Sequence, residues 1–276
     1  MNQIINMLCP AKLNLMLEVL GKRADGMHEI KSHFQLINLF DELTIKKANK
    51  PQSTITTNSS LDIENENNIV YQAMLSLSKY TKQDIHCEIH IIKNIPIGGG
   101  LGGGSSNAAA ALIGINKLFN LSLSISELMV IGKELGADVP FFIFGKNAIA
   151  TGIGEVLEEV HCMNSKFLII SPNIHTSTKE MFAEWDELDV FNSPQNLQGY
   201  NNSFLPLFLS KNTDLHKIYK ELSLASDIKL SGTGSTMFCI YKEDVEIEKT
   251  LKKIPTKWRH FFCEPLQCSP LLKYLT

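Results

Sequence analysis

The stretch PIGGGLGGGSSNAAAALIGINKLF, residues 96–119, decides the fold, because it connects a strand to a helix through a run of glycines. Before it, residues 85–92 alternate apolar and polar side chains, which predicts a β-strand that has ended by Pro96. After the glycines, Ser105 opens an alanine-rich segment that favours a helix to about Phe119. Six of the chain's 17 glycines lie within positions 98–104. Glycines at this density let a ligand approach the main chain closely.

The glycine run and the helix start together predict an anion site. Successive backbone N–H groups at a helix N-terminus bind phosphate without arginine, and the helix dipole adds to the attraction. The chain has only two arginines, Arg23 and Arg259, which excludes a site built from several guanidinium forks. The hydroxyls of Ser105 and Ser106 can cap the helix, donate to phosphate oxygens or approach a cation. A flexible hinge is the alternative, although so many glycines are an entropically costly linker.

Two common phosphate loops do not fit this stretch. A Walker A loop ends in Gly-Lys-Ser/Thr, whereas Gly104 is followed directly by Ser105. The dinucleotide pattern G-x-G-x-x-G is matched by residues 98–103, but a run this rich in glycine matches it by default. That pattern also needs an acid about 20 residues later, at a strand end. Residues 111–126 contain no Asp or Glu, so an NAD-dependent oxidoreductase is disfavoured.

Strand and helix signals interleave along the chain without a regular βαβ period, which favours the α+β class over a doubly wound sheet. Residues 11–19 alternate, with Leu13, Leu15, Leu17 and Val19 on one face and Lys12 and Asn14 on the other. Further strands are predicted at 34–40, 43–45, 167–170, 228–230 and 237–241, and helices begin after Asn68 and at the capping box of Ser124. We expect long loops with short helices over 183–212, and domains at 1–160 and 161–276.

Composition and charge limit the classes of protein to which this chain can belong. The 276 residues are 44% hydrophobic, and 26 basic side chains face 29 acidic ones, for a net charge of −3. This balance gives no general attraction to nucleic acid or to an anionic membrane. No apolar stretch approaches the ~18 residues that span a bilayer, and the N-terminus lacks the positive segment of a secretory signal. The six cysteines and eight histidines show no metal-ligand spacing. We expect a cytoplasmic protein with reduced core thiols.

Residues 96–109 resemble the ATP-binding motif of the GHMP kinases, a superfamily of small-molecule kinases. Four other segments resemble further motifs of that superfamily in the same order: PAKLNL at 10–15, RADGMH at 23–28, GADVP at 136–140 and LSGTG at 230–234. The likeness is greatest to the branch that phosphorylates a methylerythritol linked to cytidine diphosphate. It implies the two-domain GHMP fold, in which an N-terminal α+β nucleotide-binding domain is followed by a smaller ferredoxin-like domain.

The resemblance implies a catalytic pair, Lys12 and Asp138. From local sequence alone, Asp138 is either a turn residue or a functional acid, and Lys12 is an ordinary strand lysine. By resemblance, Asp138 accepts the proton of the substrate hydroxyl. Lys12 keeps that acid ionised and stabilises the transferring phosphoryl group. The implied ATP-binding residues are Pro96, Ile97, Gly98, Gly99, Gly100, Leu101, Gly102, Gly103, Gly104, Ser105, Ser106 and Asn68, of which Asn68 is equally well explained as a helix cap.

The implied substrate-binding residues are Asn14, Met27, His28, Thr178 and Phe182. His28 resembles the histidine that reads the cytosine edge, with a turn histidine as the alternative. Phe182 resembles an aromatic that stacks on cytosine, with a core phenylalanine as the alternative. Met27 occupies a position where the family commonly has tyrosine. Its polarizable sulfur can still pack on a base, but stacking should be weaker.

The function that the resemblance implies is transfer of phosphate from ATP to the 2-hydroxyl of that cytidyl substrate, in non-mevalonate isoprenoid biosynthesis. ATP and Mg²⁺ are the implied cofactors, with Ser105 or Ser106 as candidate metal contacts. The small-molecule substrate is the expected partner of a monomer or homodimer, without nucleic acid or membrane. A GHMP kinase for homoserine or a mevalonate derivative is the alternative within the class. A nucleotide-binding module without catalysis is the alternative outside it.

Overall fold

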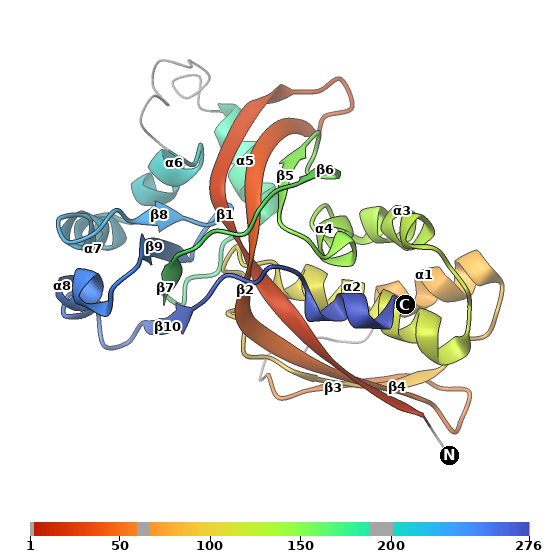
Figure 1. The fold of residues 1–276 in the computed structure, drawn as a ribbon. Helices are drawn as coiled ribbons and strands as arrows, with labels where there is room; N and C mark the ends of the chain where they lie inside the picture. Colours follow the sequence, from red (N-terminus) through yellow and green to blue (C-terminus); the bar gives the residue numbers. More distant parts are fainter. Residues whose placement is uncertain (1–2, 60–66, 188–200, 276) are drawn as a thin grey trace.

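A computed structural model describes residues 3–59, 67–187 and 201–275 of the chain. In this part of the chain, helices accompany two separate sheets, one of six strands and one of four (Figure 1). The α+β class predicted from the sequence is confirmed.

The N-terminal sheet is built on a long antiparallel ribbon of β1 (Ile4–Lys22) and β2 (His28–Lys47), which runs through the molecule in red and orange in Figure 1. The sheet order is β3-β4-β2-β5-β6, with β1 paired to β2. The shorter strands are β3 (Thr54–Thr57), β4 (Cys87–Ile92), β5 (Ala148–Thr151) and β6 (Val156–Glu159). The prediction of two strands at 34–40 and 43–45 is wrong, because β1 pairs along both halves of β2 and keeps it continuous.

A register shift in β1 changes which side chains share a face. Between Asn14 and Met16 the pairing with β2 slips by one residue, as at a β-bulge. Such a slip reverses the alternation of the side chains that follow it. Leu17 therefore lines the same cavity as Lys12 and Asn14, and the prediction that it shares a face with Leu13 is wrong.

The helices that the structure describes beside this sheet are α1 (Ile69–Thr81), α2 (Gly103–Phe119), α3 (Ile125–Leu135) and α4 (Val139–Phe144). The alanine-rich α2 packs on β1 and β2 and contacts the other three helices. A side chain at Gly114 would collide with Ile45 and Met7, so a small residue there allows the close approach. The predicted cap of α1 at Asn68 and the capping box of α3 at Ser124 are confirmed.

The C-terminal sheet has the order β10-β7-β9-β8 and is antiparallel throughout. Its strands are β7 (Lys166–Ser171), β8 (Lys229–Leu230), β9 (Met237–Tyr241) and β10 (Arg259–Cys263). Among the described residues, β7 and β8 are separated by the helices α5 (Thr178–Glu187), α6 (Leu205–Ser210) and α7 (Thr213–Ser223). Between β9 and β10 lie η3 (Asp244–Ile247) and α8 (Glu248–Leu251). This is the β-α-β-β-α-β order of a ferredoxin-like unit. Of the loops predicted over 183–212, residues 188–200 lie outside the described residues.

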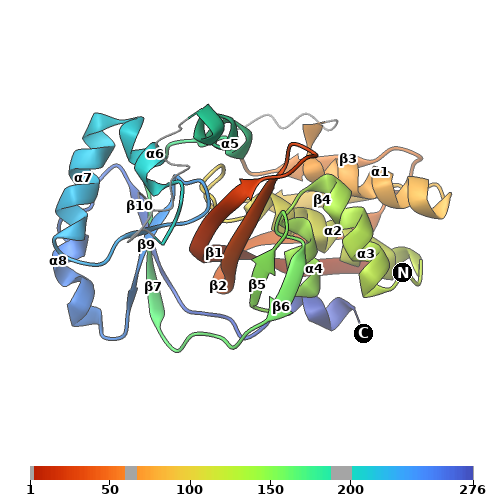
Figure 2. The same cartoon turned by 90° about the horizontal axis from the view of Figure 1, so that it is seen from above.

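Several contacts connect the two sheets, and Figure 2 shows the chain returning from β10 toward the first sheet. Leu17 of β1 exchanges backbone hydrogen bonds with residues 201 and 203, which precede α6. After β10 the chain returns to the first sheet, where Leu266 N donates to Leu36 O and η4 (Pro270–Tyr274) packs on β1 and α2. The domain division at residue 160 stays a prediction. No helix in the described ranges has the length and apolarity that a membrane crossing requires.

Candidate active site

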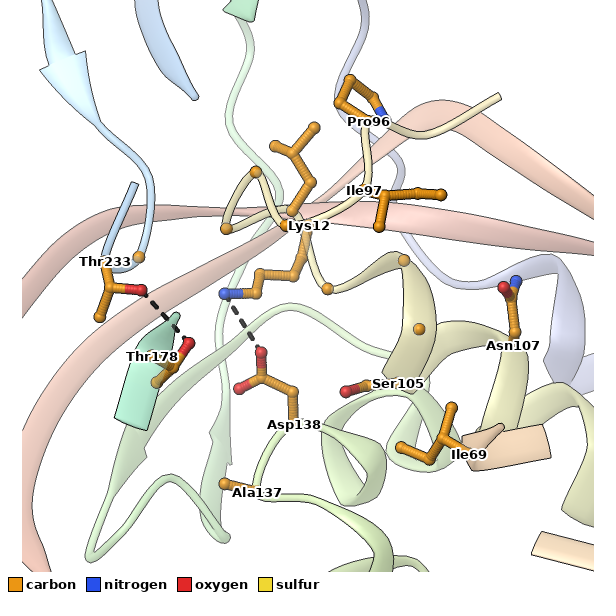
Figure 3. Close-up of a pocket in the computed structure, with 18 of the residues that line it drawn as sticks. Lys12, Ile69, Pro96, Ile97, Ser105, Asn107, Ala137, Asp138, Thr178 and Thr233 are labelled. Atoms are coloured by element: carbon orange, nitrogen blue, oxygen red, sulfur yellow. Dashed lines mark hydrogen bonds and ion pairs between the residues drawn. The ribbon is translucent and has the colours of Figure 1, made fainter. Parts of the chain in front are cut away.

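A cavity of about 490 Å³ lies where the N-terminal sheet and its helices meet the loops of the C-terminal sheet (Figure 3). Most of the residues that the sequence singles out line it: Lys12, Asn14, Asn68, Pro96, Ile97, Gly98, Gly99, Gly100, Leu101, Gly102, Gly103, Gly104, Ser105, Asp138, Thr178 and Phe182. Met27, His28 and Ser106 are not among its described lining residues. Segments as far apart in the sequence as Lys12 and Phe182 thus converge on one space.

Lys12 and Asp138 meet in this cavity, although 126 positions separate them. The Lys12 Nζ lies 3.3 Å from the Asp138 Oδ2, and the two side chains point toward each other in Figure 3. Only 4% of the Lys12 side chain is exposed, against 30% for Asp138. The ammonium also donates to Asn14 Oδ1 at 2.5 Å and lies 5.1 Å from the centroid of the Phe34 ring. Lys12 is therefore fixed in place, whereas the carboxylate of Asp138 opens to the cavity.

Loops that follow strands β7 and β8 donate hydrogen bonds to the carbonyl groups of the glycine loop. Gly98 O accepts from Thr176 N at 3.2 Å, and Gly99 O accepts from Thr236 N at 3.1 Å. Gly100 O accepts from the Ser231 hydroxyl at 3.1 Å, and that hydroxyl also accepts from Asn14 N at 3.2 Å. Ser231 thereby connects the glycine loop to the strand that carries Lys12.

Glycine is required at Gly100 and Gly102 for two physical reasons. Both residues have positive φ, +75° and +71°, which side chains rarely adopt. A Cβ at Gly100 would also lie 2.3 Å from Ser231 O, and one at Gly102 would lie 2.8 Å from the Phe142 ring. The loop conformation therefore depends on the absence of side chains.

The N-terminus of α2 faces the cavity through Gly103, Gly104 and Ser105. Gly102 is the N-cap and has no side chain to satisfy the first N–H groups, and the first turn holds no acid. Free N–H groups at the start of a 17-residue helix carry partial positive charge. This end of the cavity is suited to an anion such as phosphate.

The opposite end of the cavity is formed by side chains of α5 and the loop after β8. The Thr178 and Thr233 hydroxyls lie 3.2 Å apart (Figure 3). Phe182 stacks on His28 with ring centroids 4.6 Å apart, so His28 is adjacent to the cavity wall. Met27 is 47% exposed, and its backbone N donates to Asp25 Oδ1.

The sequence of this chain is similar to known kinases over nearly its whole length. Residues 68–146 match the model of the GHMP kinase N-terminal domain. The 4-diphosphocytidyl-2-C-methyl-D-erythritol kinase of Ruthia magnifica subsp. Calyptogena magnifica is 36% identical over 275 residues, which cover 96% of this chain and 95% of the relative. The enzyme of the same name from Marinomonas sp. (strain MWYL1) is 36% identical over 95% of this chain and 87% of its own.

The chain belongs to the 4-diphosphocytidyl-2-C-methyl-D-erythritol kinase family of GHMP kinases. A crystal structure of a 4-(cytidine 5'-diphospho)-2C-methyl-D-erythritol kinase superposes with a TM-score of 0.76 at 25% identity, covering 94% of this chain and 98% of that one. A mevalonate kinase structure superposes with a TM-score of 0.71 at 16% identity, over 95% and 99% of the two chains, which shows the shared fold alone. The predicted GHMP kinase fold is thus confirmed.

A second lysine–aspartate pair in this kinase was not predicted. Lys93 lines the cavity beside the glycine loop, and its ammonium is paired with Asp41 and donates to Asn107 Oδ1 at 2.7 Å. Asp41 is completely buried and also accepts from the backbone N–H groups of Asn94 and Ile95, at 2.8 and 2.9 Å. No short sequence pattern predicts this pair, because Asp41 lies within β2 and Lys93 directly follows β4, 52 positions later.

The cavity of this kinase offers few ligands for a metal. Asp138 is the only carboxylate among its described lining residues, and no cluster of three metal-binding side chains occurs in the described ranges. The Ser106 hydroxyl is buried without a hydrogen-bond partner at the start of α2. Mg²⁺ binds phosphorylated substrates through one or two protein oxygens while keeping phosphate and water ligands. This donor set fits a Mg²⁺ ion that phosphates hold for the most part, with Asp138 or Ser105 as protein oxygens, whereas Ser106 does not line the cavity.

Proposed function

We propose that this kinase transfers the γ-phosphoryl group of ATP to the 2-hydroxyl of 4-diphosphocytidyl-2-C-methyl-D-erythritol, with ADP as the second product. The observation that carries the proposal is the meeting of Lys12 and Asp138 beside the glycine loop and the N-terminus of α2. Family membership at 36% identity supports the substrate.

Asp138 acts on the acceptor alcohol. Its carboxylate opens to the cavity, and it can orient the hydroxyl and accept its proton as the new O–P bond forms. Lys12 is held by Asn14, so its ammonium remains beside the carboxylate. A positive charge at this distance stabilises negative charge on the transferring group.

The backbone positions the triphosphate. Phosphoryl transfer depends mainly on alignment and charge stabilisation, and the glycine loop with the α2 N-terminus supplies both without arginine. Mg²⁺ neutralises phosphate charge when it is bound. The adenine end extends toward Asn68, which lines the cavity and whose Oδ1 accepts from Val70 N.

The cytidyl end of the substrate lies at Thr178, Phe182 and His28. Asn14 contacts the substrate beside Lys12. The reaction belongs to non-mevalonate isoprenoid biosynthesis, and we place the enzyme in the cytoplasm as a monomer or homodimer.

Domains 1–160 and 161–276 would close on the substrates from the two sides of the cavity.

A substrate panel tests the proposal. The purified chain is incubated with Mg²⁺-ATP and the cytidyl alcohol, homoserine or mevalonate, and ADP release is followed. We expect turnover with the cytidyl alcohol alone. Turnover with homoserine or mevalonate in its place would overturn the substrate, and ATP binding without any turnover would overturn the kinase.

A further inference from the structure

Helix α5 presents a cluster of side chains to the end of the β1–β2 ribbon. Phe182, Trp185 and Asp186 lie at helical spacings that place them on one side of the helix. His28, the first residue of β2, is 9% exposed among them. Its ring stacks on Phe182, with an interplanar angle of 28°, and meets Trp185 edge-on at 6.0 Å. The orientation of the imidazole is therefore fixed by two aromatic rings.

Asp186 completes this cluster by binding one ring nitrogen of His28. Its Oδ1 lies 2.6 Å from His28 Nε2, and its Oδ2 lies 2.5 Å from the Lys22 ammonium. Burial opposes ionisation of Asp186, but the hydrogen bonds from Lys22 and His28 outweigh it and lower the pKa of the carboxyl. An ionised carboxylate only accepts hydrogen bonds, so Nε2 must carry the proton. No described residue bonds to the other nitrogen, Nδ1.

We propose that Asp186 is a positioning residue for base recognition, which fixes His28 in the form that offers Nδ1 as a hydrogen-bond acceptor. The inference rests on the proposed function, in which the base of the substrate lies beside His28 and Phe182. Cytosine carries an amino donor at the place where uracil carries a carbonyl acceptor. An acceptor at Nδ1 pairs with the amino group and repels the carbonyl. Asp186 thus gives the site its preference for cytosine.

A purely structural role for Asp186 makes a different prediction. The carboxylate also joins α5 to the ribbon through Lys22, and loss of that contact would impair substrates with either base equally. The two roles are separated by the ratio of kcat/KM for the cytidyl substrate to kcat/KM for its uridyl counterpart. This ratio is insensitive to the amount of correctly folded enzyme.

The test compares Asp186→Asn with the unaltered enzyme on both substrates. The amide keeps the size of the carboxylate but can donate as well as accept, so His28 is free to carry its proton on Nδ1. We expect the ratio to fall about tenfold, which is the scale of one hydrogen bond, while the KM for ATP stays unchanged. Asp214→Asn, at an exposed acid paired with Lys217 on α7, is the matched control and should leave the ratio unchanged.

His28→Phe provides a second variant that keeps the ring stack without its nitrogens. In that background Asp186→Asn should have no further effect on the ratio. Nitrogen-15 spectra of labelled histidine report the protonated ring atom directly, and we expect Nε2–H in the unaltered enzyme. An unchanged ratio in Asp186→Asn, or an Nδ1–H ring in the unaltered enzyme, would overturn the inference. Absence of turnover with the cytidyl substrate in the unaltered enzyme would overturn the proposed function instead.

Discussion

Two lysines that line the cavity, Lys12 and Lys93, each pair with an aspartate. The two pairs differ in the saturation of the carboxylate, meaning how many hydrogen bonds it already accepts. In the pair of Lys93 and Asp41, the acid is fully buried and accepts from the ammonium and from two backbone N–H groups. In the pair of Lys12 and Asp138, the acid is 30% exposed, and Lys12 is its only side-chain partner among the described residues. A saturated carboxylate stabilises the fold. A carboxylate with free lone pairs facing a cavity can accept a proton.

The largest effect should come from removing the free carboxylate. We expect Asp138→Asn to reduce kcat by about 10²–10⁴-fold, the scale of general-base catalysis, because the amide cannot take the proton of the alcohol. ATP binding, measured by calorimetry, and the thermal midpoint should change little, since the side chain is partly exposed. Near-normal ADP release would remove Asp138 from this role.

Removing the saturated carboxylate should instead affect stability. Asp41→Ala leaves two backbone N–H groups without their acceptor and the Lys93 ammonium with Asn107 Oδ1 alone among the described residues. Loss of one partner of a buried pair costs about 3–5 kcal/mol. Urea denaturation measures this loss as a lower free energy of unfolding. The control is Asp214→Ala on the surface of α7, which should alter stability little. An Asp41→Ala protein as stable as the parent would show that the pair is not structural.

Ser231 connects the free pair to the glycine loop, so its loss should have an intermediate effect. Ser231→Ala removes a hydrogen bond to Gly100 O and one from Asn14 N, each with a net contribution of about 0.5–1.5 kcal/mol. We expect lower stability together with a several-fold higher KM for ATP. Ser231→Thr keeps the hydroxyl and should restore both values. Equal damage from alanine and threonine would mean that the hydroxyl is unimportant.

The smallest effect concerns a thiol beside the saturated pair. Burial is the main cause that raises the pKa of Cys9 to about 12, with a further contribution from Asp41. At pH 8, four units below that value, about one Cys9 in 10⁴ is a thiolate, so iodoacetamide should alkylate it very slowly. The exposed Cys268 should react first, as peptide mass spectrometry can show. Alkylation of both thiols at one rate would contradict the burial of this region.

Features set by local chemistry were predictable from the sequence. The glycine loop, the Asn68 cap and the capping box at Ser124 each depend on residues within a few positions of one another. The fold followed from the resemblance, and so did the meeting of Lys12 with Asp138. No local rule places residues from β1 and from the start of α4 in one cavity.

Features set by tertiary pairing were not predictable. The bulge in β1 that brings Leu17 onto the face of Lys12 carries no glycine or proline to mark it. The pairing of Asp41 with Lys93 and that of Asp186 with His28 depend on strand register and helix packing. These contacts form between elements whose relative placement a single sequence does not encode in any short pattern.

The most direct test is a crystal structure with an unhydrolysable ATP analogue and the cytidyl alcohol. We expect the triphosphate to lie on the backbone of residues 98–106, with the acceptor hydroxyl within hydrogen-bond distance of Asp138 and Lys12 beside the γ-phosphate. A nucleotide bound elsewhere, with the glycine loop empty, would contradict the account.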